Sequence, residues 1–362
     1  MRPAFATNWQ KVGFIIVAFL AMAAPLLTGK HLAPPRERIY SAIPWDEGAF
    51  PFTHDQIFEE SGDIDIAFMG ASIMWWGIDT PYVQTELARK IGRPAVVRSL
   101  GWDRSGLDAF YFILKDLLAH RRVHLLVFTH VGTSTSEMAH PQANRWFVYG
   151  TDAGELAGLG LRSKLSYYNS AIIGMPRNLL DLLRPNLPAL PADEILLDGY
   201  KPAVNPARRL GSLAHRSSEY FNFTNFTPAT SVSPAEVCVS PDTPRSPFEF
   251  AGQKQPELQR FFARKIAALA REHNVHLVFL HLPKTTEIGS AVIPEIAFWP
   301  EVFQARMELV GIPAAKLYAG MSREDILKLY LDFQHFNENG QKYFTPIITP
   351  ALLNLYEAKA SH

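Results

Sequence analysis

After residue 63 the chain alternates between two hydrophobic patterns. Short, nearly uninterrupted apolar runs are typical of strands that are buried on both faces. They occur at residues 64–69, 95–101, 123–128, 275–280 and, as a shorter run, 316–318. Stretches with an apolar residue every three or four positions predict helices, at residues 81–91, 107–120 and 258–273. Strands that alternate with helices predict an α/β fold whose parallel sheet is covered on both faces.

The N-terminal pattern is different. Residues 12–29 carry no charge, and their length lies at the lower limit for a helix that spans a bilayer. Arg2 and Lys11 precede this run, which favours a cytoplasmic N-terminus and an exported remainder. Residues 1–30 are therefore expected to be an uncleaved membrane anchor, or a signal peptide cleaved near Ala21-Met22-Ala23. A buried core helix is a third interpretation.

Two regions interrupt the strand–helix rhythm. Residues 31–62 are rich in proline and charge, which predicts a linker rather than packed structure. The domain itself is expected over residues 63–362, with an insertion at about 144–256 that contains many prolines and a helix at 164–183. The insertion is either a lid that contacts substrate or a passive surface elaboration.

Composition excludes several classes of function. Thirty-five basic residues balance thirty-five acidic ones without a basic stripe, so nucleic acid is not expected as a partner. The single cysteine, Cys238, excludes a disulfide within the chain and a cysteine-rich metal site. The twelve histidines lack the spacing of metal ligands, and no metal or other cofactor is expected.

Candidate chemistry begins where the first two strands end. The run at 64–69 is followed by Gly70-Ala71-Ser72, which places a serine on a strand-to-helix turn, and the second strand ends at Gly101. The carboxyl ends of parallel strands share one edge, where ligands bind. Ser72 is then either a nucleophile whose own amide faces an oxyanion, or an ordinary helix cap. Gly101 is either an amide donor to a bound carbonyl or a turn glycine.

The second half of the candidate site lies 260 residues later. Asp332 precedes His335 by three residues on one loop, just before an apolar helix that runs through Tyr343 and Ile348. A carboxylate in this position holds an imidazole in the tautomer that a general base needs. The alternative is a histidine that caps or packs against the helix.

These motifs together resemble the SGNH (GDSL-like) hydrolase and acyltransferase superfamily, over residues 63–133 and 258–356. Gly70-Ala71-Ser72, with Gly77 five residues after the serine, is similar to the first block of that family. Gly101 is similar to its second block, and Asp332-x-x-His335, followed by Asn337-x-x-Gly340, to its fifth.

The resemblance implies a flavodoxin-like three-layer α/β/α sandwich with a central parallel sheet. It also implies Ser72 as nucleophile, His335 as base, Asp332 as the residue that orients it, and Gly101 in the oxyanion hole. The third block departs from the family, which commonly has Gly-x-Asn-Asp there. This chain has Thr129-His-Val-Gly-Thr-Ser134, so Ser134, or else His130, is the expected donor in place of the asparagine.

An oxyanion donor typically contributes about 100- to 1,000-fold in rate, so this departure favours a specialised branch over a fast general hydrolase. Together with the exported anchor, it resembles the envelope acyltransferases of polysaccharides and the D-alanyl transfer protein of teichoic acid. The expected partners are an envelope polymer, an acyl donor delivered by a membrane protein, and the membrane. Trp75 and Trp76 either stack on carbohydrate or pack against the sheet. A catalytically silent scaffold and a secreted esterase for small esters are the alternatives.

Overall fold

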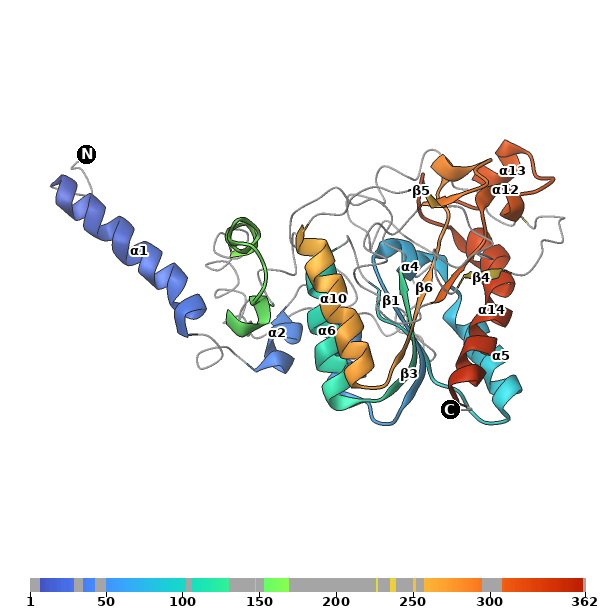
Figure 1. Cartoon of the computed structure of the whole chain (residues 1–362), viewed down its shortest axis with the longest axis horizontal. Coiled ribbons are helices and arrows are strands. Elements are labelled where there is room, and N and C mark those ends of the chain that lie inside the picture. The colour runs from blue at the N-terminus through green and yellow to red at the C-terminus, as the bar shows by residue number, and fades with distance from the viewer. Residues whose placement is uncertain are drawn as a thin grey trace.

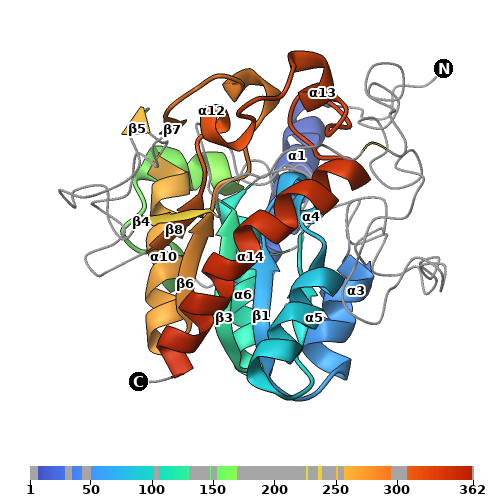
Figure 2. The same ribbon diagram turned by 90° about the vertical axis from the view of Figure 1, so that its right-hand side faces the viewer.

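The computed structural model describes residues 7–28, 35–42, 50–101, 106–129, 147, 153–168, 226, 235–238, 250–251, 257–294 and 308–360. Its centre is one sheet of six strands (Figures 1 and 2). Five of them are parallel, in the order β2 (Val97–Ser99), β1 (Ile64–Met69), β3 (Val123–Thr129), β6 (His276–Leu280) and β8 (Glu308–Gly311). A short antiparallel strand, β4 (Glu236–Cys238), follows β8 at the edge.

Helices cover both faces of this sheet. The helices α5 (Thr80–Ile91) and α14 (Glu338–Ala360) lie on one face, and α6 (Leu107–His120) and α10 (Glu257–Glu272) on the other (Figure 1). The expected α/β fold with a parallel sheet is confirmed. Shorter elements connect the layers: α4 (Ser72–Gly77), η4 (Ala153–Leu156), η7 (Thr285–Glu287), α12 (Ala314–Leu317), α13 (Arg323–Leu327), and the pair β5 (Phe250–Ala251) and β7 (Ile293–Pro294).

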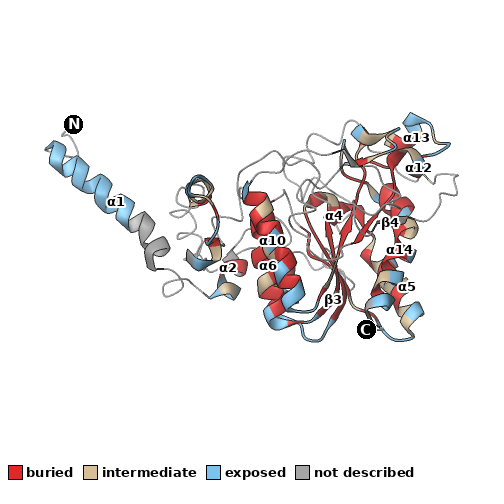
Figure 3. Ribbon diagram, viewed as in Figure 1, coloured by how far each residue is buried: buried red, intermediate tan, exposed pale blue. Residues whose placement is uncertain are grey.

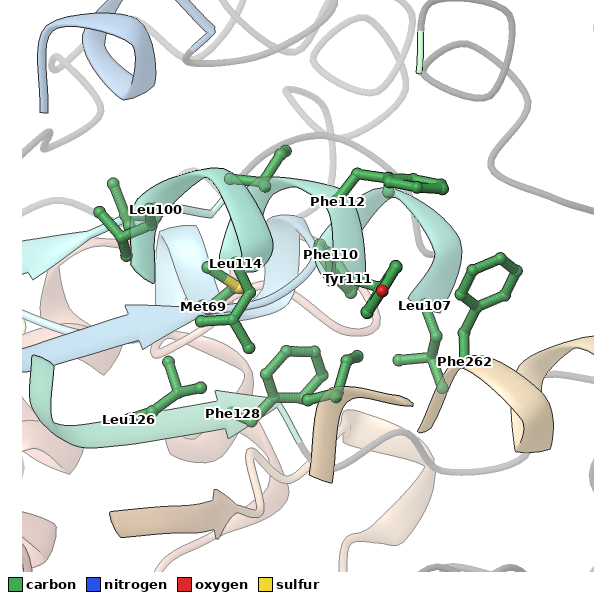
Figure 4. Close-up of a cluster of buried hydrophobic side chains, with 14 of the residues drawn as sticks. Met69, Leu100, Leu107, Phe110, Tyr111, Phe112, Leu114, Leu126, Phe128 and Phe262 are labelled. Atoms are coloured by element: carbon green, nitrogen blue, oxygen red, sulfur yellow. The ribbon is translucent and has the colours of Figure 1, made fainter. Parts of the chain in front are cut away.

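Each face of the sheet has its own hydrophobic core. The described strands and the inner sides of the four helices are largely buried (Figure 3). The core between the sheet and α6–α10 is rich in aromatic rings, because β3, α6 and α10 all contribute phenylalanines to it (Figure 4). Phe110 meets Phe128 edge to face, with ring centroids 5.3 Å apart. Aromatic pairs of this kind add to the free energy of burial.

The fifth parallel strand is not where we expected it. Residues 316–318 belong to the end of α12 and the residue after it, and the strand is β8. The sequence pattern did not predict β8 because this strand begins with a charged residue. Glu308 is buried, and its Oε2 lies 2.8 Å from Nε2 of His276 on β6. A buried carboxylate with a partner across the sheet is tolerated in a strand. Because Glu308 and Gly311 stand at its two ends, β8 has an apolar run of only two residues.

The expectation of an unpacked linker over residues 31–62 was wrong where the structure describes this stretch. It forms α2 (Arg36–Ala42), α3 (Phe50–His54) and η3 (Asp55–Glu59). Ile39, Tyr40, Phe52 and Ile57 are buried in the core beside α6. Proline is compatible with the first turn of a helix, so a proline-rich sequence can still pack as short helices.

The insertion also contributes to the domain where it is described. Its strand β4 extends the main sheet, and a helix over residues 161–168 overlaps the start of the helix that we expected at 164–183. Tyr167 is buried, 6.0 Å from the ring of Phe262. The remainder of the expected helix lies outside the described residues.

An N-terminal helix, α1 (Asn8–Thr28), precedes the domain (Figure 1). Its side chains are exposed over the part for which they are described: Trp9 is 84% exposed and Ile15 64%. Within the described residues, no helix combines the length and the apolar character that crossing a bilayer requires. The anchor or signal segment expected over residues 1–30 stays a prediction.

Candidate active site

Ser72 lies at the carboxyl edge of the sheet, at the first position of α4 directly after β1. The turn between them requires a glycine. A Cβ atom on Gly70 would lie 1.6 Å from Oγ1 and 2.6 Å from Cβ of Thr129, at the end of the neighbouring strand β3. The absence of a side chain at Gly70 therefore lets β1 turn sharply and leaves the serine at the edge.

The structure joins the serine to the distant C-terminal motif by two hydrogen bonds. Oγ of Ser72 lies 2.8 Å from Nε2 of His335, and Nδ1 of the same ring lies 2.7 Å from Oδ2 of Asp332. All three residues are buried, and His335 is fully inaccessible to solvent. A serine, an imidazole and a carboxylate in this order form the arrangement of a serine nucleophile with its base and orienting acid.

Asp332 is held in place by hydrogen bonds within its own loop. Its Oδ1 accepts hydrogen bonds from the backbone N–H groups of Gln334 and His335, both at 2.8 Å. Burial alone would raise the pKa of Asp332, but the bonds from the His335 ring and the two N–H groups outweigh burial and lower it. The carboxylate is thus ionised at neutral pH, with one oxygen committed to the backbone and the other to the imidazole.

The loop that carries the pair is fixed at its C-terminal end by Asn337. The amide nitrogen of its side chain donates to the carbonyls of Lys328 and Tyr330, while its oxygen accepts from the backbone N–H groups of Asn339 and Gly340. The last two groups belong to the first turn of α14, so Asn337 caps that helix. His335 precedes this cap by two residues, which limits how far its backbone can move.

A second support comes from the segment after β6. Both the backbone N–H and the hydroxyl of Thr285 donate to the carbonyl of Phe333, at 3.0 and 2.9 Å. The backbone N–H of Leu331 also donates to the carbonyl of His335 at 2.7 Å. The sequence reasoning missed Thr285, because a threonine that holds a backbone carbonyl has no recognisable motif.

The predicted oxyanion residues have different outcomes. Gly101 follows β2 and packs against the first turn of α4: a Cβ atom there would lie 2.8 Å from Cβ of Trp75. The structure thus brings Gly101 to the same edge as Ser72. Ser134 and the alternative donor His130 lie outside the described residues. The amide of Ser72 is in the first turn of a helix, where N–H groups lack intrahelical acceptors.

The two tryptophans after the serine are packing residues. Trp75 is 2% and Trp76 5% exposed, and both belong to the core beside α6. A carbohydrate ring has no access to a buried indole face, so the stacking alternative is wrong and the packing alternative is confirmed. The backbone carbonyl of Trp76 accepts a hydrogen bond from the side chain of Gln341, which ties α4 to α14.

Comparison with known proteins does not assign the chain to a family. No family model, curated protein or solved structure matches the chain.

Proposed function

We propose that this protein is a serine-dependent acyltransferase of the cell envelope, in which Ser72 carries the acyl group. The observation that supports the proposal most directly is the continuous hydrogen-bonded chain from Oγ of Ser72 through His335 to Asp332. Its parts come from opposite ends of the sequence and meet at the sheet edge where α/β proteins bind ligands.

The geometry suits a two-step transfer. In the first step Nε2 of His335 takes the proton of Ser72, and Oγ forms a bond to the acyl carbon. The proton then passes from His335 to the leaving group as its bond to the acyl carbon breaks. In the second step the same nitrogen takes the proton of an acceptor hydroxyl, whose oxygen forms a bond to the acyl carbon. The bond between that carbon and Oγ of Ser72 then breaks, and the proton passes from His335 to Oγ. Asp332 stays ionised throughout and holds the ring.

Two further features support the proposal: the strand order supports the SGNH resemblance, and helix α1 supports the envelope location. The parallel strands follow the order second, first, third, fourth and fifth in the chain, which is the flavodoxin-like order implied by the SGNH resemblance. The exposed apolar side chains of α1 support a membrane anchor. Arg2 and Lys11, which precede its apolar run, favour a domain on the extracytoplasmic side, periplasmic or at the cell surface. The acceptor that we propose is a sugar or polyol hydroxyl of an exported polymer, and the donor an acyl group supplied by a membrane protein.

The nucleophile is tested with a fluorophosphonate probe on the full-length protein in detergent. We expect one probe molecule per chain on Ser72, as located by peptide mass spectrometry. Ser72→Ala should abolish labelling. A folded wild-type protein that takes up no probe would leave only the silent-scaffold alternative. A matched control is Ser322→Ala, which removes an exposed cap of α13 and leaves the triad untouched.

The second experiment separates transfer from hydrolysis. The wild-type protein is given an activated acetyl ester with and without an envelope oligosaccharide, and acetyl groups on sugar and in water are counted. We expect the oligosaccharide to capture most of the acetyl groups, because a bound acceptor has a high effective concentration. Rapid release to water that is unaffected by the oligosaccharide would identify an esterase instead.

A further inference from the structure

The helix over residues 161–168 presents an apolar face to solvent. Leu161 is 72% exposed and Leu165 61%, and their spacing of four residues places them on the same side of the helix. Large apolar side chains that are exposed as neighbours mark a surface that binds something, whereas isolated ones do not. Elsewhere among the described residues of the domain, exposed large apolar side chains occur only singly, at Tyr82 and Phe333.

This helix is held firmly on the domain, so its outward face has a fixed direction. Its buried side contributes Tyr167, whose ring packs against Phe262 of α10. At its start, the backbone N–H of Gly160 and the hydroxyl of Ser163 both donate to the carboxylate of Glu257, at 2.9 and 2.6 Å. The leucines therefore point away from α10 as part of a docked helix.

The same side of the domain carries the connection to α1. Helix α2 packs there: Tyr40 donates a hydrogen bond to Asp116 of α6, and Arg36 lies 3.5 Å from the same carboxylate. Residue 28 ends α1 and residue 36 begins α2, so an extended chain separates them by at most about 28 Å, at about 3.5 Å per residue. In Figure 1 the green 161–168 helix and α2 both lie on the α1 side of α6 and α10.

The charged residues beside the two leucines indicate what kind of surface this face of the helix contacts. Arg162 and Lys164 lie on either side of the Leu161–Leu165 line on the helical wheel, and the described helix carries no acidic residue. An apolar stripe flanked by basic residues is the pattern of helices that lie in the interface of a membrane, with their apolar side at the acyl boundary.

We propose that the face formed by Leu161, Leu165, Arg162 and Lys164 rests in the headgroup region of the membrane that holds α1. This inference builds on the proposed envelope anchoring. Two attachments, a tether at α2 and a contact at residues 161–168, would fix the orientation of the sheet. The carboxyl edge with Ser72 would then stay at a constant height above the lipid, where a membrane protein delivers acyl groups.

Spin-label accessibility tests the contact directly. The full-length protein with Cys238→Ser is placed in vesicles of phosphatidylcholine and phosphatidylglycerol with no other protein, and a label is attached at Leu165→Cys. We expect the label to collide more often with oxygen than with a water-soluble nickel complex. The control label is Arg89→Cys on α5, across the sheet, which should favour the nickel complex. Equal water accessibility at residues 165 and 89 would overturn the proposal, and would favour a protein partner for this face.

A third label, at Ile16→Cys in α1, separates this inference from the proposed anchoring. If residue 16 lies in the bilayer while residue 165 stays in water, only the lipid contact is wrong. If residue 16 is itself in water, the anchoring is wrong, and the lipid contact falls with it. Fluorophosphonate labelling of Ser72 in the same samples reports on the nucleophile independently of both.

A functional test uses charge. Leu161→Glu with Leu165→Glu should reduce acyl transfer from a vesicle-bound donor by about tenfold or more, since misplaced reactants lose rate steeply. Hydrolysis of a soluble activated ester should be unchanged. Thr85→Glu with Arg89→Glu places the same two carboxylates one helical turn apart on α5 and should change neither rate. Unchanged transfer in the leucine variant would contradict the proposal.

Discussion

Replacing Asp332 with asparagine is the sharpest test of the candidate site, because it changes hydrogen-bond direction and almost nothing else. In the wild type, Oδ1 accepts two backbone N–H groups and Oδ2 faces Nδ1 of His335. Asparagine has one acceptor and one donor group in these places. If the NH₂ group of asparagine faces the imidazole, Nδ1 meets a donor in place of an acceptor. If the NH₂ group faces the backbone, the two backbone N–H groups have no acceptor.

The magnitudes decide which of the two orientations asparagine adopts. If its NH₂ group faced the backbone, the N–H groups of Gln334 and His335 would lose their acceptor. Each buried N–H left without a partner costs about 1–3 kcal/mol, or about 2–6 kcal/mol for both. The oxygen should therefore stay on the backbone, and NH₂ will face Nδ1. His335 then carries its proton on Nε2 and cannot accept the proton of Ser72, which typically costs about 10⁴-fold in kcat.

Two measurements check this reasoning. Steady-state hydrolysis of an activated ester should fall by about 10⁴-fold in Asp332→Asn, and ¹⁵N NMR should show that the imidazole proton has moved from Nδ1 to Nε2. The thermal midpoint should change little. Asp325→Asn, on the nearby helix α13, removes the charge of an aspartate that pairs with Lys328 and does not contact the triad; it serves as the control and should keep full activity. Activity within tenfold of the wild type, or an unchanged tautomer, would refute the role of Asp332.

Three further changes probe the supports of the site and of the fold. Gly70→Ala forces a Cβ atom into Thr129, and should destabilise the fold by about 1–3 kcal/mol and abolish fluorophosphonate labelling of Ser72. A variant that melts at the same temperature as the wild type and is labelled equally would contradict the need for a glycine in this turn. Asn337→Ala removes four hydrogen bonds and the cap of α14, and should lower the free energy of unfolding in urea by about 2–4 kcal/mol. Fluorophosphonate labelling of Ser72 should also become slower, because His335 loses its support. A loss below about 0.5 kcal/mol would argue against the cap. Burial alone would raise the pKa of Glu155, but hydrogen bonds from two lysines and a tyrosine lower this pKa to about 2. The contribution of Glu155 to the free energy of unfolding is therefore complete above pH 4.5, the ordinary pKa of a glutamate, and is lost as the pH falls towards 2. Glu155→Gln should flatten the dependence of unfolding free energy on pH in that window, and an unaltered slope would show that this carboxylate is not the group responsible.

Local pattern was sufficient where one element could be recognised from its own residues. The helix expected at residues 107–120 has those bounds in the structure, and β1 and β3 lie where nearly uninterrupted apolar runs placed them. Pattern failed at β8, whose glutamate has its partner in a histidine on another strand, and at α2, α3 and η3, whose buried residues pack in the core beside α6. In both cases the deciding contact is with a residue far away in the sequence.

The candidate site divides in the same way. The residue types and the spacing of Gly70-Ala71-Ser72 and Asp332-x-x-His335 are local, and by themselves they indicate a serine nucleophile with a base and an acid. The 2.8 Å contact that turns these motifs into one site joins residues 263 positions apart. Only the packed sheet, with α14 against it, could determine this contact, because a distance of this kind depends on every layer between the two residues.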